Sequence, residues 1–380
     1  MKDLISYAAF LPFALVAMAC SAEPEDVEDV EALDESVSYA DAARLSVFTM
    51  TNDPAANAVV GLRRNNTGNL EPVVEVFTQG KGTGAGLGSQ GAVLLDKSGK
   101  WLFTVNAGTN SIASFKVGKH SLTLRSVVDS GGEQPVSVTL HGDTLYVLNA
   151  AGAGNIVGFK VDDGDLEEIS GSMRPLSGAP LTAAAQVQFT PDGGGLVVTE
   201  KATNLIDTYS VGADGTTTGP VVSTSHGQTP FGFAFNKHET LIVSEAFGGA
   251  PNASKVSSYM IESSGMTNVV TPSIGVDQSA ACWVAVTKNG QYAYVTNTGS
   301  NTISVFSVDH CGALAPVPGS EAVPTSAGPT DMAVVGNKAL YVLASTADEI
   351  QAYSIQGDGS LTATGAVIGV PVAAAGLAAR

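Results

Sequence analysis

Four polar residues in the middle of the chain have side chains that could together perform acid–base chemistry. Glu200 and Glu245 end two similar segments, LVVTE and LIVSE, which lie 45 residues apart. Lys201 follows Glu200 directly, and His226 lies between the two glutamates in the segment SHGQTP. Neighbouring carboxyl groups push each other's pKa values apart, so that one can act as an acid and the other as a base. The same group of side chains could instead bind a cation.

The two glutamates also have a structural interpretation, because their segments belong to a repeat. Seven similar segments recur at intervals of 43 to 54 residues, and six of them end on a polar residue. They are FTMTN to Asn52, LFTVN to Asn106, LYVLN to Asn149, LVVTE to Glu200, LIVSE to Glu245, AYVTN to Asn297 and LYVLA to Ala344. Asparagine at a strand end commonly caps the next turn, and glutamate can accept the same backbone N–H groups. Catalysis and capping are therefore both open for Glu200 and Glu245.

Each copy of the repeat has the pattern of four short strands. The copy that begins at Pro135 contains PVSVTLHG, TLYVLN, NIVGFKV and LEEI, separated by short turns rich in Gly and Asp. Four antiparallel strands in a repeat of this length are typical of a β-propeller blade. The composition agrees with an all-β fold, since charged residues make up only 14% of the chain and Gly occurs 43 times.

The two ends of the repeat region indicate how the ring closes. The copy that ends at Asn52 has no first strand before it, whereas a surplus segment, PVAAAGLAAR, occupies residues 371–380 after the last complete copy. We expect this segment to supply the missing innermost strand and to leave no open blade edge. The sequence therefore predicts a seven-bladed propeller over residues 45–380, closed by its C-terminal strand.

The position of a residue within the repeat assigns it to one face of the propeller. The ends of the second strands and the loops from a fourth strand to the next first strand share one face, here called the upper face. The turns after first and third strands share the lower face. We expect a ligand site over the channel on the upper face. Of the five histidines only His226 falls there, because His120, His141, His238 and His310 lie in lower-face turns.

Three other motifs have simpler interpretations at their places in the repeat. The segment DDGD, residues 162–165, resembles a calcium loop but occupies a turn that other copies fill with GADGT or QGDGS. The run GKGTGAGLG, residues 80–88, lacks the Gly-Lys-Ser/Thr ending of a phosphate loop and is expected to form an upper-face loop. Cys282 and Cys311 fall on opposite faces, too far apart for a disulfide with each other, so two free thiols are expected.

The N-terminal region has the pattern of an export signal followed by a tether. A largely apolar run follows Lys2, and residues 17–19, AMA, precede Cys20. We expect a signal peptide over residues 1–19 and a lipid on Cys20, as in a bacterial lipoprotein; an ordinary signal peptidase cutting the same bond would give a secreted protein. Residues 20–44 are expected to be an acidic disordered tether, with eight acidic and no basic residues between Glu23 and Glu35.

The charge and composition also limit the partners. A formal net charge of −18 argues against binding to nucleic acid or to an anionic membrane surface. Contact with a membrane is expected only through a lipid at Cys20. We expect a monomer in the bacterial cell envelope, on the periplasmic face or the cell surface, with no cofactor and no metal.

The repeats resemble those of the seven-bladed propeller lactonase family. The resemblance rests on segments such as CWVAVTKNGQYAYVTNTGSNTISVFSV and VQFTPDGGGLVVTEKATNLIDTYSV, and it extends from Leu45 to the C-terminus. The family includes bacterial 6-phosphogluconolactonase-like proteins and fungal carboxymuconate cyclases. The resemblance implies a seven-bladed fold and a small-molecule lactone or carbohydrate-like ligand.

The resemblance also implies which polar residues to look for over the channel. The cyclase members use a His, two Arg and a Glu, and Glu200 matches the Glu. The His would fall near residues 134–136, the first Arg near residues 184–186 and the second Arg at Thr298, and this chain has neither His nor Arg at these places. Arg binds carboxylate and phosphate groups in a bidentate manner. The departures therefore imply an uncharged or weakly charged substrate.

Two functions of different classes follow. In the first, the protein hydrolyses or forms a lactone at the upper mouth of the channel, with Glu200 and Glu245 as the acid–base pair and His226 and Lys201 assisting. In the second, a lipid-anchored propeller binds a glycan, a peptide or a partner protein through its upper-face loops and performs no chemistry. A fold-level resemblance does not choose between them.

Overall fold

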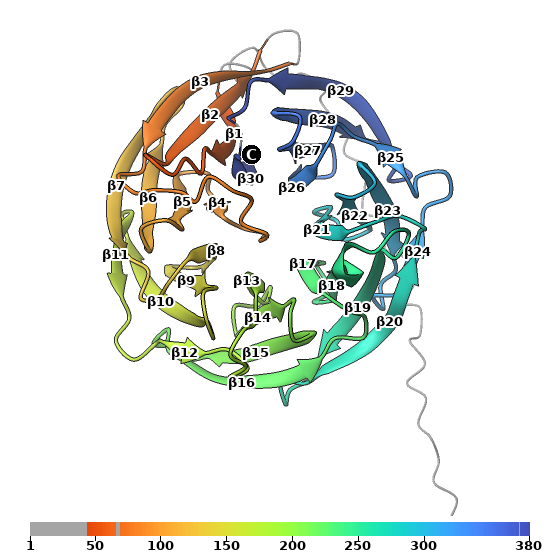
Figure 1. Cartoon of the computed structure of the whole chain (residues 1–380), viewed down its shortest axis with the longest axis horizontal. Coiled ribbons are helices and arrows are strands. Elements are labelled where there is room, and N and C mark those ends of the chain that lie inside the picture. Colours follow the sequence, from red (N-terminus) through yellow and green to blue (C-terminus); the bar gives the residue numbers. More distant parts are fainter. Residues whose placement is uncertain (1–43, 66–68, 372) are drawn as a thin grey trace, which may run out of the picture. The chain divides into compact units, whose positions relative to one another are not determined.

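Seven antiparallel sheets form the blades of a ring (Figure 1), as the repeat predicts. The computed structural model describes residues 44–65, 69–371 and 373–380. The predicted signal peptide, Cys20 and nearly all of the predicted acidic tether lie outside these residues. The seven-bladed β-propeller is confirmed.

The strands occupy the same four positions in each blade, and the blades are numbered here in chain order. The innermost strands of blades one to seven are β30 (Ala375–Ala379), β4 (Val93–Leu95), β8 (Pro135–His141), β13 (Ala184–Phe189), β17 (Pro230–Phe235), β21 (Ala281–Val286) and β26 (Pro329–Val335). The second strands are β1 (Leu45–Met50), β5 (Trp101–Asn106), β9 (Thr144–Asn149), β14 (Gly195–Glu200), β18 (Leu241–Glu245), β22 (Tyr292–Asn297) and β27 (Ala339–Ala344).

The outer half of each blade follows the same order. The third strands are β2 (Ala58–Arg64), β6 (Ser111–Val117), β10 (Asn155–Asp162), β15 (Leu205–Val211), β19 (Lys255–Ile261), β23 (Thr302–Val308) and β28 (Glu349–Ile355). The outermost strands are β3 (Leu70–Phe77), β7 (Leu122–Asp129), β11 (Asp165–Glu168), β16 (Thr217–Thr224), β20 (Thr267–Gly275), β24 (Leu314–Pro316) and β29 (Leu361–Ile368). Two short strands, β12 (Arg174–Pro175) and β25 (Val323–Pro324), pair with β10 and β23, and a 3-10 turn (Phe247–Gly249) follows β18.

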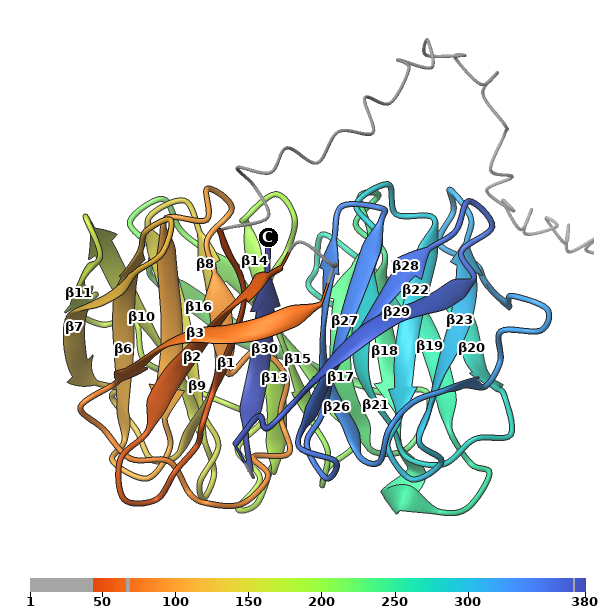
Figure 2. The same ribbon diagram turned by 90° about the horizontal axis from the view of Figure 1, so that it is seen from above.

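The C-terminal strand closes the ring as the sequence predicts. β30 pairs antiparallel with β1, with Thr49 opposite Leu377, and the two strands lie side by side in Figure 2. Arg380 completes the closure, because its guanidinium donates hydrogen bonds to three backbone carbonyls, those of Leu45 (2.9 Å), Gly118 (3.2 Å) and Gly99. The closing strand thereby ties blade one to the neighbouring turns of blade two.

The burial of each strand follows from its place between neighbouring blades. Second strands have blades packed on both faces, and every residue of β18 is buried. A strand covered on both faces is expected to be a continuous apolar run rather than an alternating one. Outermost strands face solvent on one side, and β3 alternates between buried or half-buried and exposed positions along much of its length. The apolar core is therefore distributed between the blades.

The DDGD segment is the tight turn that the repeat predicts. It joins β10 to β11, with Asp162 paired to Asp165. The two central residues have positive φ, 42° at Asp163 and 85° at Gly164, as a two-residue hairpin turn requires. A Cβ atom at Gly164 would lie 2.1 Å from the Trp101 ring, so the position also requires glycine for space.

The prediction for the two cysteines is correct for one of them. Cys282 is a free, buried thiol in β21, and burial raises its pKa to about 12. Cys311 takes part in a disulfide bond, so the prediction of a free thiol at this position is wrong. The two cysteines are not bonded to each other, as expected from their opposite faces.

No helix among the described residues is long and apolar enough to cross a membrane.

Candidate functional site

Glu200 is buried, and hydrogen bonds occupy both oxygens of its carboxylate. It ends β14 and its exposed fraction is 0%. The oxygens accept hydrogen bonds from the backbone N–H of Ser177 (2.9 Å) and from the hydroxyls of Ser177 (2.8 Å) and Thr203 (2.5 Å). Ser177 belongs to the loop from blade three to blade four, so Glu200 fixes this loop to the end of its own strand.

Glu245 fixes the next loop in the same way. It ends β18 and also has an exposed fraction of 0%. Its carboxylate accepts hydrogen bonds from the backbone N–H of Gly227 (2.9 Å) and from the hydroxyls of Ser257 and Ser273. A Cβ atom at Gly227 would lie 1.9 Å from Oε2 of Glu245, so only glycine allows the loop to approach this closely.

Asparagines at equivalent strand ends hold loops in other blades. Asn106 accepts a hydrogen bond from the Thr78 hydroxyl (2.6 Å), and Asn149 donates one to the Ser130 carbonyl (3.0 Å). Each partner lies in the loop that arrives from the preceding blade. The geometry of Glu200 and Glu245 therefore fits the capping interpretation of the repeated strand end.

Lys201 and His226 lie in different environments. The Lys201 ammonium donates to the Gly88 carbonyl and lies 4.6 Å from the centre of the Phe231 ring, and burial lowers its pKa to about 8. His226 is exposed, and its backbone N–H donates to the Tyr259 hydroxyl at 2.9 Å. In the described part of the chain, no hydrogen bond or ion pair joins the four predicted side chains to one another. Each of the four residues has its hydrogen-bond partners in other residues.

A carboxyl group that the sequence analysis missed lies beside Glu200. Asp207 in β15 is fully buried, and neither of its oxygens has a hydrogen-bond donor among the described residues. Burial and the Glu200 carboxylate raise the pKa of Asp207 to about 8. A raised pKa favours the protonated form of Asp207, which reduces the repulsion between the two carboxyl groups. The sequence could have indicated Asp207, because it is a charged residue at an inward position of the largely apolar strand LIDTYSV.

The Gly-rich loop of residues 80–91, here called the plug loop, crosses the upper mouth of the channel. It leads from β3 to β4 and reaches toward the centre of the ring (Figure 1). Gln90 forms two hydrogen bonds with the backbone of Val284 in blade six, at 2.7 Å and 3.0 Å. The backbone N–H of Gln90 donates to the Ala185 carbonyl of blade four at 3.1 Å. One residue therefore links blades on two sides of the channel, through its side chain to blade six and its backbone to blade four.

The same loop has further anchors in three blades. The Trp283 indole N–H of blade six donates to the Ser89 carbonyl at 2.9 Å, and the Ser89 hydroxyl donates to the Val136 carbonyl of blade three, also at 2.9 Å. Lys201 of blade four holds the Gly88 carbonyl. The Gly-rich composition lets this backbone pass close to several blades, and the loop obstructs the mouth where a ligand site was expected.

Below the plug loop the channel widens into a cavity of about 880 Å³. All seven innermost strands line it, through Leu377, Val93, Val138, Val187, Phe233, Val286 and Met332. Lower-face turns line it as well, through Lys97, Gly142, Pro191, Lys237 and Lys288. The central cavity therefore opens on the lower face, opposite to the face expected from the sequence.

Asp331 in β26 is the carboxyl group at the inner end of this cavity. It also lines a chamber of about 90 Å³ beneath the plug loop. Its oxygens accept hydrogen bonds from the backbone N–H groups of Met332 (2.8 Å) and Leu377 (3.2 Å). Burial outweighs these bonds and raises the pKa of Asp331 to about 7. The sequence analysis missed Asp331 because it searched strand ends and loops, whereas this residue interrupts an innermost strand, PTDMAVV.

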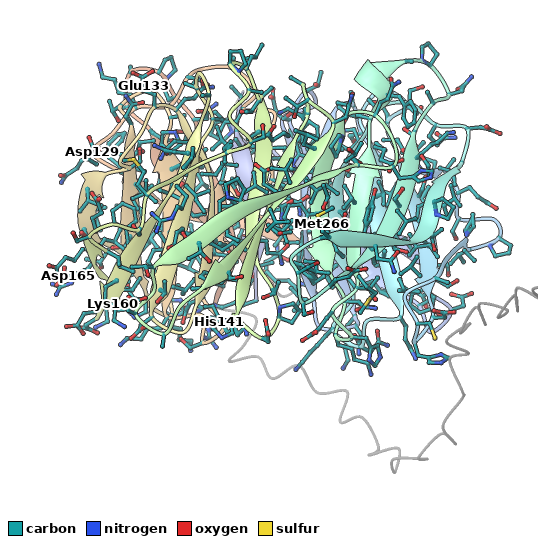
Figure 3. The ribbon with its side chains drawn as sticks, turned by 90° about the horizontal axis from the view of Figure 1, so that it is seen from below. Asp129, Glu133, His141, Lys160, Asp165 and Met266 are labelled. Carbon is teal, nitrogen blue, oxygen red and sulfur yellow. The ribbon has the colours of Figure 1, made fainter. Side chains whose placement is uncertain are left out.

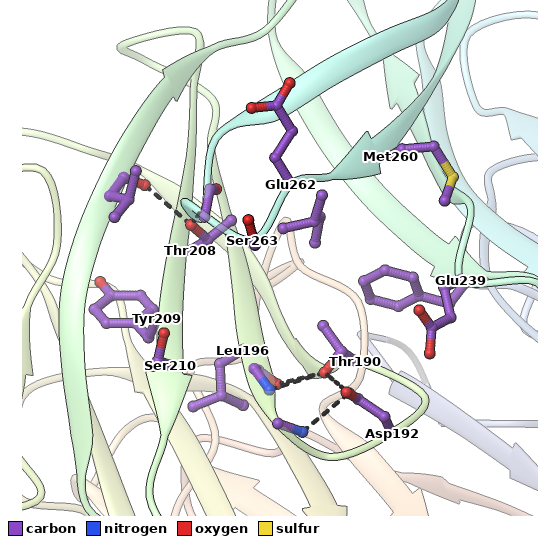
Figure 4. Close-up of a pocket in the computed structure, with 16 residues that line it drawn as sticks. Thr190, Asp192, Leu196, Thr208, Tyr209, Ser210, Glu239, Met260, Glu262 and Ser263 are labelled. Atoms are coloured by element: carbon purple, nitrogen blue, oxygen red, sulfur yellow. Dashed lines mark hydrogen bonds between the residues drawn. The ribbon is translucent and has the colours of Figure 1, made fainter. Parts of the chain in front are cut away.

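A smaller groove lies between blades four and five on the lower face (Figure 4). It has a volume of about 270 Å³ and contains the carboxylates of Asp192, Glu239 and Glu262. Asp192 is engaged in its own turn, where it accepts hydrogen bonds from the Thr190 hydroxyl (2.6 Å) and the Gly194 N–H (3.0 Å), and these bonds lower its pKa. No three His, Cys, Asp or Glu side chains of the described residues are arranged to hold a metal ion.

The comparison with protein families agrees with the fold. The model of the family described as "Lactonase, 7-bladed beta-propeller" matches residues 55–177 and 260–375, more than half of the chain. The chain belongs to this family. The segment between the two matched ranges contains Glu200, Lys201, His226 and Glu245, whereas Asp331 lies inside a matched range.

Solved structures of similar proteins span nearly the whole propeller. A candidate 6-phosphogluconolactonase of Bacteroides fragilis is 20% identical, with a TM-score of 0.68 over 88% of this chain and 97% of that one. The periplasmic gluconolactonase of Pseudomonas aeruginosa is 16% identical, with a TM-score of 0.68 over 87% and 99%. A Lactobacillus plantarum protein is 17% identical, with a TM-score of 0.70 over 88% and 98%. These likenesses show the fold. No curated protein sequence matches the chain.

Proposed function

We propose that this propeller hydrolyses or forms a lactone in its central cavity, with Asp331 as the general base. The observation that carries the proposal is a buried carboxyl group, with its pKa raised to about 7, at the inner end of a cavity of about 880 Å³. A cavity of this size can hold a small molecule. Membership of the lactonase family supports the reaction class.

The chemistry requires a base that is partly ionised near neutral pH. In hydrolysis, Asp331 takes a proton from water while the water oxygen attacks the lactone carbonyl carbon. The ring C–O bond then breaks, and the proton passes to the leaving ring oxygen to give a hydroxy acid. General bases are most effective when their pKa lies near the working pH. The N–H groups of Met332 and Leu377 keep the carboxylate in a fixed orientation.

Glu200 and Glu245, assisted by His226 and Lys201, are the competing candidates for the acid–base pair. Both glutamates are fully buried and their oxygens already accept hydrogen bonds. Reaction there would require the incoming loops to move away. Asp331 is also buried and accepts hydrogen bonds from two backbone N–H groups, but it lines the central cavity, which neither glutamate does. Asp331 is therefore the preferred base, and a Glu200→Gln/Glu245→Gln double variant separates the two assignments.

The second candidate function is binding without chemistry. The propeller would then recognise a glycan, a peptide or a partner protein. This function is supported by the fact that the chain lacks most of the polar residues that the family's cyclase members use. For example, Thr298 stands where those members have an Arg, and its hydroxyl donates a hydrogen bond to the Pro329 carbonyl at 2.8 Å. The absence of turnover in wild-type protein would favour this function.

For its location, we propose export to the bacterial cell envelope with a lipid on Cys20, or secretion if Cys20 is not lipidated. The chain has three cysteines, Cys282 is free and Cys311 is disulfide-bonded. A disulfide within one chain would use the Cys20 sulfur that the lipid requires, so this disulfide and the lipid exclude each other. The support is the sequence of residues 1–20 and the periplasmic location in the name of the Pseudomonas aeruginosa relative. The protein is proposed to act as a monomer. Mass spectrometry of the mature N-terminus tests the lipid directly.

The proposed activity is tested by a lactone screen with three proteins. Wild type is offered sugar, aromatic and acyl lactones, and the best substrate is then tested with Asp331→Asn and with Glu200→Gln/Glu245→Gln. We expect Asp331→Asn to lower kcat/KM by about 10²–10⁴-fold, and the double variant to retain its rate while folded. If the double variant is folded and loses its rate while Asp331→Asn keeps it, the glutamates and not Asp331 act as the acid–base pair.

A further inference from the structure

The turns that surround the lower mouth of the central cavity carry basic residues in most blades. Lys97, Lys237 and Lys288 occupy the turn between the first and second strands of blades two, five and six, and His141 ends the first strand of blade three, directly before that turn. All four line the central cavity. In a chain with a net charge of −18, this concentration of basic groups around one opening is unusual.

The lysines at the mouth have no carboxylate partner among the described residues, unlike three cations that lie farther out on the lower face. Lys100, Arg125 and Lys160, farther from the cavity, form ion pairs with Asp163, Asp165 and Asp143. Figure 3 shows Lys160 and Asp165 at the same end of the propeller as His141, and Asp129 and Glu133 at the opposite end. Among the described residues, Lys97, Lys237 and Lys288 form no ion pair, and all three are exposed, so their charge is available to a ligand.

Two carboxyl groups line the same cavity and offset part of this charge, but the three lysines outnumber them. Asp96 is engaged in its own turn, where it accepts hydrogen bonds from the backbone N–H groups of Ser98 (3.2 Å) and Trp101 (2.7 Å). Asp331 lies at the inner end, away from the lysines of the turns. Asp192 of blade four and Glu239 of blade five line the neighbouring groove, and neither lines the central cavity. Within the cavity, an anion is therefore favoured at the three lysines.

We propose that the lower mouth of the central cavity is a binding site for an organic anion, held by Lys97, Lys237 and Lys288. The ligand carries a carboxylate or a phosphate group, the two anions for which ammonium groups are suitable partners. It reaches the cavity from the lower face, because the plug loop obstructs the upper mouth. This site goes beyond the proposed activity, since it binds an anion whether or not Asp331 acts as a base.

Calorimetric titration at low ionic strength tests this site without measuring turnover. Citrate is the carboxylate probe, inorganic phosphate is the phosphate probe, and glucose is the uncharged control. A Lys97→Gln/Lys237→Gln/Lys288→Gln variant is compared with Lys100→Gln/Lys116→Gln/Lys160→Gln, which removes the same charge from the same face outside the mouth. Circular dichroism establishes that both variants are folded.

We expect wild type to bind citrate or phosphate but not glucose. The variant at the mouth should bind at least about tenfold more weakly, whereas the outer variant should stay within about twofold, because screened charges act mainly at short range. Asp331→Asn should bind the anion at least as tightly as wild type, because it removes a negative charge from the same cavity, while it loses the proposed reaction. Absence of anion binding to wild type, or an equal loss in both triple variants, would overturn the proposal.

Discussion

Asp207 and Asp331 are buried carboxyl groups whose pKa values lie well above the ordinary value for Asp. Burial is the main cause in both, and it raises their pKa values to about 8 and about 7. Their surroundings differ, because Asp331 lines the central cavity whereas Asp207 is enclosed beside Glu200. We therefore assign chemistry to Asp331 and a structural role to Asp207.

Asp207 should make the stability of the protein depend on pH. Its pKa is about 8 in the folded protein against 3.8 as the ordinary value, so the folded state binds more protons between these pH values. The free energy of unfolding should therefore fall as pH rises from about 4 to about 8, by up to about 1.4 kcal/mol per unit from this one group. Asp207→Asn cannot ionise and should remove this contribution. Urea unfolding at pH 5 and pH 8 measures the difference, and an unchanged pH dependence would contradict the raised pKa of Asp207.

At the scale of the elements, the polar residue that ends a second strand was given two roles by the sequence, one in capping a loop and one in catalysis. The sequence pattern of a polar residue ending each second strand predicted both the blades and a candidate acid–base pair. In the structure, Glu200 and Glu245 hold incoming loops, as Asn106 and Asn149 do in other blades. A carboxylate offers two acceptor oxygens where an asparagine side chain offers one. Glutamate therefore suits strand ends where several donors converge.

The close contact between Gly227 and Glu245 allows a test of this element. A methyl group at Gly227 would lie 1.9 Å from the carboxylate, so Gly227→Ala must displace the loop or the glutamate. We expect a loss of about 1–3 kcal/mol in the free energy of unfolding. Gly86→Ala is the matched control, because a Cβ atom there would meet nothing within 4 Å. Equal stability of the two variants in urea unfolding would show that Glu245 does not hold this loop.

At the scale of the whole molecule, the repeat determined most of what the sequence could predict. The period, the missing first strand and the surplus segment at the C-terminus were sufficient for seven blades and their closure. The plug loop was expected on the upper face, but its course across the channel could not be predicted, because its contacts join distant parts of the chain: Gln90 and Val284 are separated by 194 residues. The cavity therefore opens on the face opposite to that expected, and we propose a carboxyl group of an innermost strand as the base instead of the predicted pair.

The pH dependence of lactone hydrolysis tests the central claim most directly. If Asp331 is the general base, kcat/KM of wild type should rise with pH and reach half of its maximum near pH 7, since only the ionised carboxyl group accepts a proton. A folded Asp331→Asn variant should lose this inflection together with most of the rate. A wild-type profile that is flat between pH 5 and pH 9, or an inflection that persists in Asp331→Asn, would contradict the claim.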